Sequence, residues 1–202
     1  MERLAILGGT FDPIHAGHLR MAHAIQKQLE FDRIVFLPAF KPPHKQVRHD
    51  FAPFEDRLAM VSLAIQPYEA FTVSSLEAER GGLSYTFDTV CCLQELWPDA
   101  DIYMIIGEDS LDQLYTWHRI LELLRLGHFV VAERPGYEGE DGVARLVAFC
   151  GAWAKEKIIH AEVPETALSS TEIRQRIKEG LPVRGMIPRE VERYIADHAL
   201  YK

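Results

Sequence analysis

The chain has 202 residues, of which 48% are hydrophobic and 26% charged, and its formal net charge at pH 7 is −8. This length suits one domain with a substantial buried core, and the negative charge argues against a general nucleic-acid binder. No apolar run approaches the ~20 residues of a membrane span or forms a signal-peptide core, so we expect a cytoplasmic protein. The three cysteines lack the spacing of a metal or disulfide framework and predict free thiols.

The N-terminal stretch combines a strand, a glycine-rich turn and a helix. Residues 4–7 form an apolar run typical of a buried parallel strand, and residues 18–29 carry apolar side chains at helical spacing. Backbone amides in the turn between them and the dipole of the helix favour a phosphate group. His15 and His18 are three residues apart, which allows both imidazoles to point into one pocket. The stretch predicts a site for anionic chemistry at phosphorus.

Short apolar runs alternate with helical stripes through the rest of the chain. Helical apolar spacing marks residues 54–65, 90–96 and 143–150, and two closing helices are predicted between residues 169 and 202. No repeat or linker interrupts the alternation, which predicts a single α/β domain over residues 1–202. We expect a Rossmann-like, doubly wound parallel sheet with helices on both faces and a small C-terminal helical part. Further strands are predicted at residues 34–37, 71–74, 102–106, 128–132 and 158–159.

Two loops follow predicted strands, at the edge where open α/β sheets bind ligands. Residues 41–45, Lys-Pro-Pro-His-Lys, cannot form regular structure, and they form either a stiff solvated loop or part of a binding site. Asp109 follows the strand at residues 102–106. Its carboxylate is equally well placed to accept from a ribose hydroxyl or to cap a helix.

Three further stretches have a structural and a functional interpretation. Ser84 is a natural cap for the helix that follows it. Trp117 lies on polar sequence after a strand, which favours stacking on a ligand over the more usual place in the core. Ser169 and Glu172 form a capping box. The helix start and Arg174 then either bind an anion or belong to a well-capped surface helix.

Several motifs together resemble those of a known family. Gly9-Thr-Phe-Asp-Pro-Ile-His-x-Gly-His-Leu19 resembles the HxGH signature of the nucleotidyltransferase superfamily. Within it, the chain is similar to bacterial-type nicotinate mononucleotide adenylyltransferases from residue 3 to about residue 198. Phe87 and Glu108 depart from the family pattern. The other matching stretches are Lys41-Pro-Pro-His44, Ser84-Tyr-Thr-x-Asp-Thr89, Ile106-Gly-x-Asp109, Trp117-His118, Arg134-Pro-Gly136 and Leu168-Ser-Ser-Thr-x-Ile-Arg174.

The resemblance implies transfer of the adenylyl group of ATP to nicotinate mononucleotide, which gives pyrophosphate and the deamido dinucleotide of NAD biosynthesis. The attacking phosphate is already an anion at neutral pH. The protein therefore needs to position it and to neutralise charge, and no strong base is required. Mg²⁺ is expected with ATP, held largely by phosphates and water, without a metal site made of protein side chains.

The resemblance also assigns roles to residues of this chain. His15 and His18 are expected to be catalytic, with His18 on an oxygen of the α-phosphate. Nicotinate mononucleotide is expected to contact Thr86, Trp117, His118 and Arg134. ATP and its phosphates are expected to contact Gly8, Gly9, Thr10, Phe11, Lys41, His44, Gly107, Asp109, Ser169, Ser170, Thr171 and Arg174.

Three other functions fit parts of the sequence. A pantetheine-phosphate adenylyltransferase shares the Gly-Thr-Phe-Asp-Pro turn but usually has Thr at the position of His15 and lacks the Trp-His pair. Cytidylyltransferases keep both histidines but lack the stretches at residues 41–44 and 84–89. A nucleotide-binding regulator without turnover is favoured only by Glu108. We expect no nucleic-acid or membrane partner, and an oligomer is compatible with the sequence.

Overall fold

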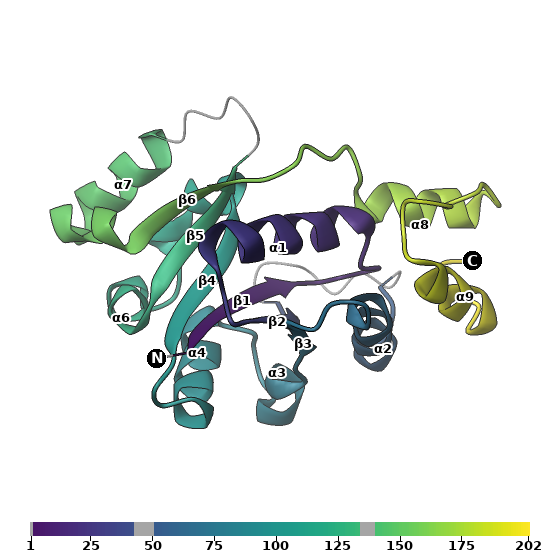
Figure 1. The fold of residues 1–202 in the computed structure, drawn as a ribbon, viewed down its shortest axis with the longest axis horizontal. Helices are drawn as coiled ribbons and strands as arrows, with labels where there is room; N and C mark the ends of the chain where they lie inside the picture. Colours follow the sequence, from purple (N-terminus) through teal and green to yellow (C-terminus); the bar gives the residue numbers. More distant parts are fainter. Residues whose placement is uncertain (1, 43–50, 134–139) are drawn as a thin grey trace.

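A computed structural model of the chain describes residues 2–42, 51–133 and 140–202 (Figure 1). Its centre is one sheet of six strands in the order β3-β2-β1-β4-β5-β6, in which every neighbouring pair is parallel. This order confirms the predicted Rossmann-like sheet, which extends to both sides of β1. The strands are β1 (Arg3–Gly9), β2 (Arg33–Pro38), β3 (Phe71–Val73), β4 (Asp101–Gly107), β5 (His128–Glu133) and β6 (Ile158–Glu162).

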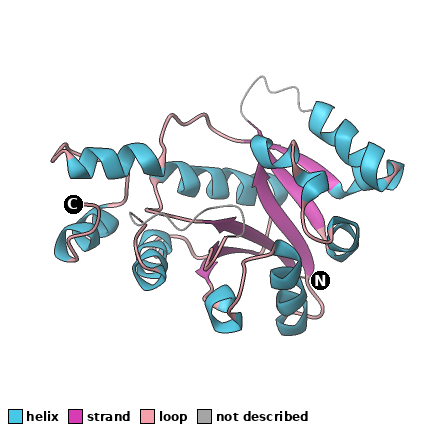
Figure 2. Ribbon diagram, turned by 180° about the vertical axis from the view of Figure 1, so that it is seen from behind, coloured by secondary structure: helices cyan, strands magenta, loops and turns pink. Residues whose placement is uncertain are grey.

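Helices cover both faces of the sheet, as predicted (Figure 1, Figure 2). Successive side chains of β1 point to opposite faces, so that Ala5 and Leu7 belong to one core and Leu4 and Ile6 to the other. The first core contains residues of α1 (Ala16–Leu29), α2 (Phe54–Ile65), α8 (Ser170–Lys178) and α9 (Arg189–Asp197). The second contains residues of α4 (Thr86–Leu96), α6 (Ile120–Leu126) and α7 (Glu140–Cys150).

Ser84 does not cap the helix that follows it. The helix α4 begins one residue later than a Ser84 cap requires, with Tyr85 at the N-cap position and no side-chain cap. The Ser84 hydroxyl oxygen instead accepts from the backbone amides of Phe40 and Lys41, at 3.0 Å each. The prediction was wrong because the hydroxyl binds the loop after β2, which lies far away in the sequence. Short elements also escaped prediction, namely α6, α3 (Leu76–Arg80), α5 (Glu108–Leu111), η1 (Leu114–Thr116) and η2 (Ala152–Lys157).

The helices α8 and α9 lie on the side of the molecule toward which β1 points (Figure 1). Ser169 is the N-cap of α8, and its hydroxyl oxygen accepts from the backbone amide of Glu172 at 3.1 Å, which confirms that half of the predicted capping box. The helix α9 packs on α2, where the Tyr194 hydroxyl donates to Asp56 Oδ1 at 2.9 Å. In the described part of the chain, the helices are too short or too polar to cross a membrane.

Candidate active site

Two adjoining pockets lie at the carboxyl ends of β1 and β4. These strands are neighbours in the sheet, and the chain winds away from them in opposite directions, which is where open α/β sheets bind ligands. The larger pocket has a volume of about 510 Å³ and the smaller one about 160 Å³. His18, Met21 and Gly107 line both pockets. The junction between the pockets is therefore built by α1, which supplies Met21 and His18 of the HxGH stretch (residues 9–19, the first motif), and by Gly107, which ends β4.

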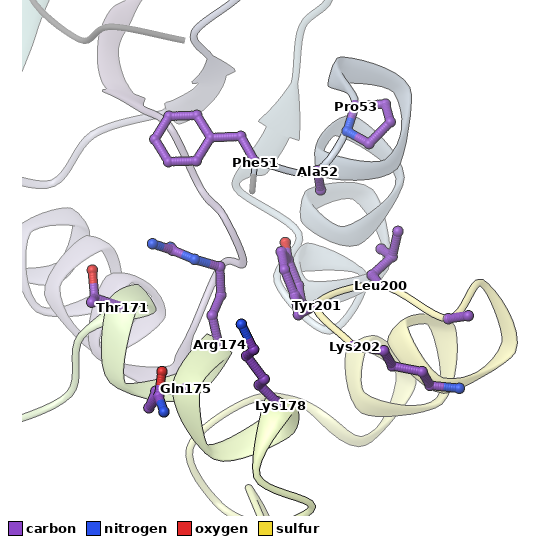
Figure 3. A pocket seen from close by; sticks show the side chains of 11 residues that line it. Phe51, Ala52, Pro53, Thr171, Arg174, Gln175, Lys178, Leu200, Tyr201 and Lys202 are labelled. Atoms are coloured by element: carbon purple, nitrogen blue, oxygen red, sulfur yellow. The ribbon is translucent and has the colours of Figure 1, made fainter. Parts of the chain in front are cut away.

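The structure brings most of the predicted site residues to these pockets. Lys41 and His118 are exposed and do not line either of them. Thr171 and Arg174 line a further cavity, of about 390 Å³ (Figure 3). His44 and Arg134 lie outside the described residues. The larger pocket is lined by Gly8, Gly9, Thr10, Phe11, His18, Thr86, Gly107 and Trp117, and the smaller one by His15, His18, Gly107 and Asp109.

The two histidines form a reciprocal cap at the start of α1. His15 is the N-cap residue, and its Nδ1 accepts from the backbone amide of His18 at 3.4 Å. His18 Nδ1 accepts in turn from the backbone amide of His15 at 3.2 Å. The rings stack with centroids 3.7 Å apart and an interplanar angle of 20°. The three-residue spacing thus places both imidazoles together, as the sequence predicted.

This cap fixes which ring nitrogen can donate. An imidazole whose Nδ1 accepts a hydrogen bond carries its proton on Nε2. The His15 side chain is 6% exposed, and burial lowers its pKa from 6.5 to about 4. His15 is therefore neutral at pH 7, with Nε2–H as its donor. Such donors, fixed before substrate binds, suit an oxygen that gains negative charge during a reaction.

The glycine between the histidines is required by close packing. A Cβ atom at Gly17 would come within 3.0 Å of Cε1 and Nδ1 of His15 and of Cγ2 of Thr166. Contacts of 3.0 Å are tighter than nine in ten real Cβ contacts, so a side chain at this position would require the His15 ring and the Thr166 methyl group to move by a few tenths of an ångström. Gly17 therefore leaves room for the imidazole ring of His15.

The buried His15 predicts a pH dependence of stability. Between about pH 6.5 and pH 4, the unfolded chain binds a proton at this imidazole and the folded chain does not, so the free energy of unfolding falls as the pH falls. The loss is at most about 3 kcal/mol, and it ends below pH 4, where both states are protonated. In His15→Asn, which keeps a capping oxygen, we expect a shallower slope in this window by urea unfolding at pH 4.5, 5.5 and 7. A slope equal to that of the unmodified chain would contradict the shifted pKa.

The position of Trp117 fits both interpretations of the sequence, a place in the core and a contact with a ligand. Its ring packs edge-on against Phe129 in the core, with centroids 5.9 Å apart, and it also lines the larger pocket. The neighbouring His118 instead packs against Tyr85, with centroids 4.5 Å apart. The predicted contact of His118 with nicotinate mononucleotide thus has no support in this geometry, and Trp117 is the member of the pair that faces the pocket.

The start of α8 docks onto the loop of the first motif. The Ser170 hydroxyl donates to the carbonyl of Pro13 at 2.9 Å, and Arg174 Nη1 donates to the carbonyl of Asp12 at 2.7 Å. The carboxylate of Asp12 is 2% exposed, and its Oδ2 lies 3.6 Å from Arg174 Nη1. The two phosphate motifs predicted from opposite ends of the sequence are therefore in direct contact.

Two buried charged residues near the pockets belong to no motif recognised in the sequence. Glu77 is 8% exposed, lines the larger pocket, and accepts from the amide of Phe40 at 3.2 Å and the hydroxyl of Thr89 at 2.9 Å. Arg57 is 5% exposed and donates to the carbonyls of residues 10, 39 and 52, at 2.7, 2.9 and 3.2 Å. Arg57 interrupts the apolar side of α2, which was its only signal in the sequence.

Known proteins match the chain over its whole length. The sequence model of the cytidylyltransferase-like family matches residues 6–176. Proteins named "Probable nicotinate-nucleotide adenylyltransferase" from Desulfitobacterium hafniense strain Y51 and Herpetosiphon aurantiacus are 39% and 42% identical to it over 201 residues. These matches cover 100% of this chain, and 96% and 99% of the two relatives. The chain belongs to the nicotinate-nucleotide adenylyltransferase family. The resemblance stated from the motifs is confirmed.

Solved structures support the same fold. Nicotinic acid mononucleotide adenylyltransferase of Plasmodium falciparum, complexed with NaAD, has a TM-score of 0.77 and a sequence identity of 19% to this chain. The match covers 100% of this chain and 98% of the Plasmodium chain, and a complex of the same protein with APC gives the same values. The fold is therefore shared with that protein at low sequence identity.

Proposed function

We propose that the chain transfers the adenylyl group of ATP to nicotinate mononucleotide, with release of pyrophosphate and formation of the deamido dinucleotide used for NAD. The observation that carries the proposal is the position of His18, which lines both pockets at their junction. Two substrates that react at one phosphorus atom need adjoining sites with fixed donors between them. The names of the relatives favour the same reaction.

Each pocket suits one substrate. The larger pocket has an apolar wall, with Trp117 and Thr86 placed to contact a pyridine ring. The smaller pocket offers the Asp109 carboxylate, which suits the hydroxyls of the ATP ribose. We assign nicotinate mononucleotide to the larger pocket and the adenosine of ATP to the smaller one.

The proposed reaction is a displacement at the α-phosphorus of ATP. An oxygen of the mononucleotide phosphate forms the new bond to phosphorus, and the bond to the bridging oxygen of pyrophosphate breaks. His18 Nε2–H donates to an oxygen of the α-phosphate, and His15 Nε2–H supports the phosphates beside it. Arg174 and the amides at the start of α8 neutralise the leaving pyrophosphate. No proton transfer to a strong base is needed.

Mg²⁺ is proposed to arrive on the triphosphate of ATP. The described residues contain no group of three or more His, Cys, Asp or Glu side chains that could hold a metal ion. Imidazoles, amides and a guanidinium dominate the donors of the site, and these fit the anionic groups of the nucleotide better than a free cation. Phosphate and water oxygens then serve as the ligands of the ion, which supplies further charge neutralisation.

A substrate panel tests the proposed function. Pyrophosphate release is measured with ATP and Mg²⁺ and with nicotinate mononucleotide, its amide or phosphopantetheine as acceptor. We expect turnover with the acid mononucleotide to exceed that with either other acceptor. Turnover mainly with phosphopantetheine would assign a different acceptor within the same superfamily, and no turnover with any acceptor would favour a nucleotide-binding regulator. A cytoplasmic location, a single domain and the absence of nucleic-acid partners belong to the same proposal.

A further inference from the structure

The buried carboxylate of Asp12 connects four segments of the chain. Its Oδ1 accepts from the backbone amide of Ala52 at 3.0 Å and from the hydroxyl of Tyr201 at 2.7 Å. Among the described residues its Oδ2 has no hydrogen-bond partner, and it faces Arg174 Nη1 at 3.6 Å. The same Nη1 donates to the carbonyl of Asp12. Asp12 therefore holds one of the proposed phosphate ligands, and Tyr201 holds Asp12.

Tyr201 is fixed by the backbone after α9. Ala199 and Tyr201 have left-handed φ values of 52° and 62°, which are unfavourable for residues with a Cβ and persist only where the surroundings hold them. The amide of Leu200 donates to the carbonyl of Ile195 at 3.0 Å, which anchors this segment to the helix. Burial, and then the charge of Asp12, raises the pKa of the Tyr201 hydroxyl, so it stays protonated and donates.

Arg174 lies between Asp12 and a basic cavity. The cavity of about 390 Å³ is lined by Arg174, Lys178 and Lys202, together with Thr171 of the first turn of α8 (Figure 3). Figure 3 shows the side chains of Tyr201 and Phe51 near that of Arg174, whose guanidinium lies 5.6 Å from the centre of the Phe51 ring. The Asp12 carboxylate therefore competes with a bound phosphate for interaction with the Arg174 guanidinium.

We propose that Tyr201 is a positioning residue for the phosphates of ATP: its hydroxyl holds the Asp12 carboxylate so that Arg174 remains available to the leaving pyrophosphate. Without the hydroxyl, Oδ1 of Asp12 loses one of its two donors, and a buried carboxylate that lacks a donor draws the nearest cation toward itself. Arg174 is that cation. The inference rests on the proposed function, because it assigns the anion as the pyrophosphate part of ATP.

The variant Tyr201→Phe tests this role, with Tyr194→Phe as its matched control. Both changes remove one tyrosine hydroxyl that donates to an aspartate, but Tyr194 and its partner, Asp56 of α2, line none of the three cavities described above. In Tyr201→Phe we expect KM for MgATP to rise about tenfold, and the affinity for inorganic pyrophosphate, measured by calorimetry, to fall by a similar factor. KM for nicotinate mononucleotide is expected to change less than about twofold, as are all constants of Tyr194→Phe.

Thermal unfolding of both variants separates positioning from folding. Because each phenylalanine keeps a ring that packs against the core, we expect similar melting temperatures, and only Tyr201→Phe is expected to lose affinity for pyrophosphate. In an Arg174→Gln background, adding Tyr201→Phe is expected to cause no further loss, since the hydroxyl acts through the guanidinium. Equal kinetic losses in both single variants, or an additive loss in the double variant, would overturn the proposal. Failure of the proposed function is recognised separately, by an unmodified protein that releases no pyrophosphate while it still binds it.

Discussion

Replacement of His18 by alanine is expected to lower turnover by about 10²–10³-fold and to leave the fold intact. Removal of one fixed donor at an oxygen that gains charge has effects of this size. The change also removes the ring that accepts from the amide of His15, and the loss of one cap contact costs about 1 kcal/mol, which is small beside the stability of a domain. The measurement is steady-state turnover with saturating substrates, together with circular dichroism of the variant.

His23→Ala is the control for this variant. His23 lies on the same helix and packs against Tyr68, with ring centroids 5.7 Å apart, and it lines neither of the two pockets. We expect its turnover to stay within about twofold of the unmodified protein. If His18→Ala keeps near-normal turnover, or if both variants lose the same amount, the role assigned to His18 is wrong.

Replacement of Arg57 by methionine is expected to destabilise the fold strongly. The methionine fills similar space but leaves the carbonyls of residues 10, 39 and 52 without this donor, and it removes a cation that interacts with the Asp12 charge. Breaking a buried charged network of this kind costs about 3–5 kcal/mol. For a chain of this size the melting temperature should fall by about 10 °C.

Arg193→Met is the matched control for the stability measurement. The Arg193 side chain is 84% exposed and pairs with Asp197 at 3.6 Å on the surface of α9. Exposed pairs of this type contribute about 0–1 kcal/mol. Differential scanning calorimetry of both variants should therefore separate them clearly. A melting temperature of Arg57→Met within about 2 °C of that of Arg193→Met would show that the buried guanidinium is not needed for folding.

The sheet could be predicted because its signals are local. The run at residues 102–106 is apolar on both faces and became β4, in the centre of the sheet. The same holds for β1, in which residues 4–7 are buried, and for β2, in which residues 34–38 are buried. By contrast, α3 and α6 have five and seven residues, too few for an apolar stripe to repeat. Their positions depend on tertiary contacts with distant residues, which a short stretch of sequence does not reveal.

The site could be predicted where a side chain binds backbone groups that are close to it in the sequence. The spacing of His15 and His18 sets their mutual cap, and Ser169 caps α8 for the same reason. The parts that were missed depend on distant partners: Ser84 binds the loop at residues 40–41, and Tyr201 binds Asp12. The sequence around a tyrosine or serine does not indicate which distant segment its hydroxyl will bind.

The contacts of Asp12 also set when the site can form during synthesis. Arg174 and Tyr201 stand 162 and 189 positions after the residue that they bind. At about 5–20 residues per second, the ribosome adds residue 201 about 10–40 s after residue 12. Over that interval the early strands can pair with one another, while the loop that follows β1 lacks its later donors. A nascent chain can therefore contain an ordered sheet long before it can hold a nucleotide in the final geometry.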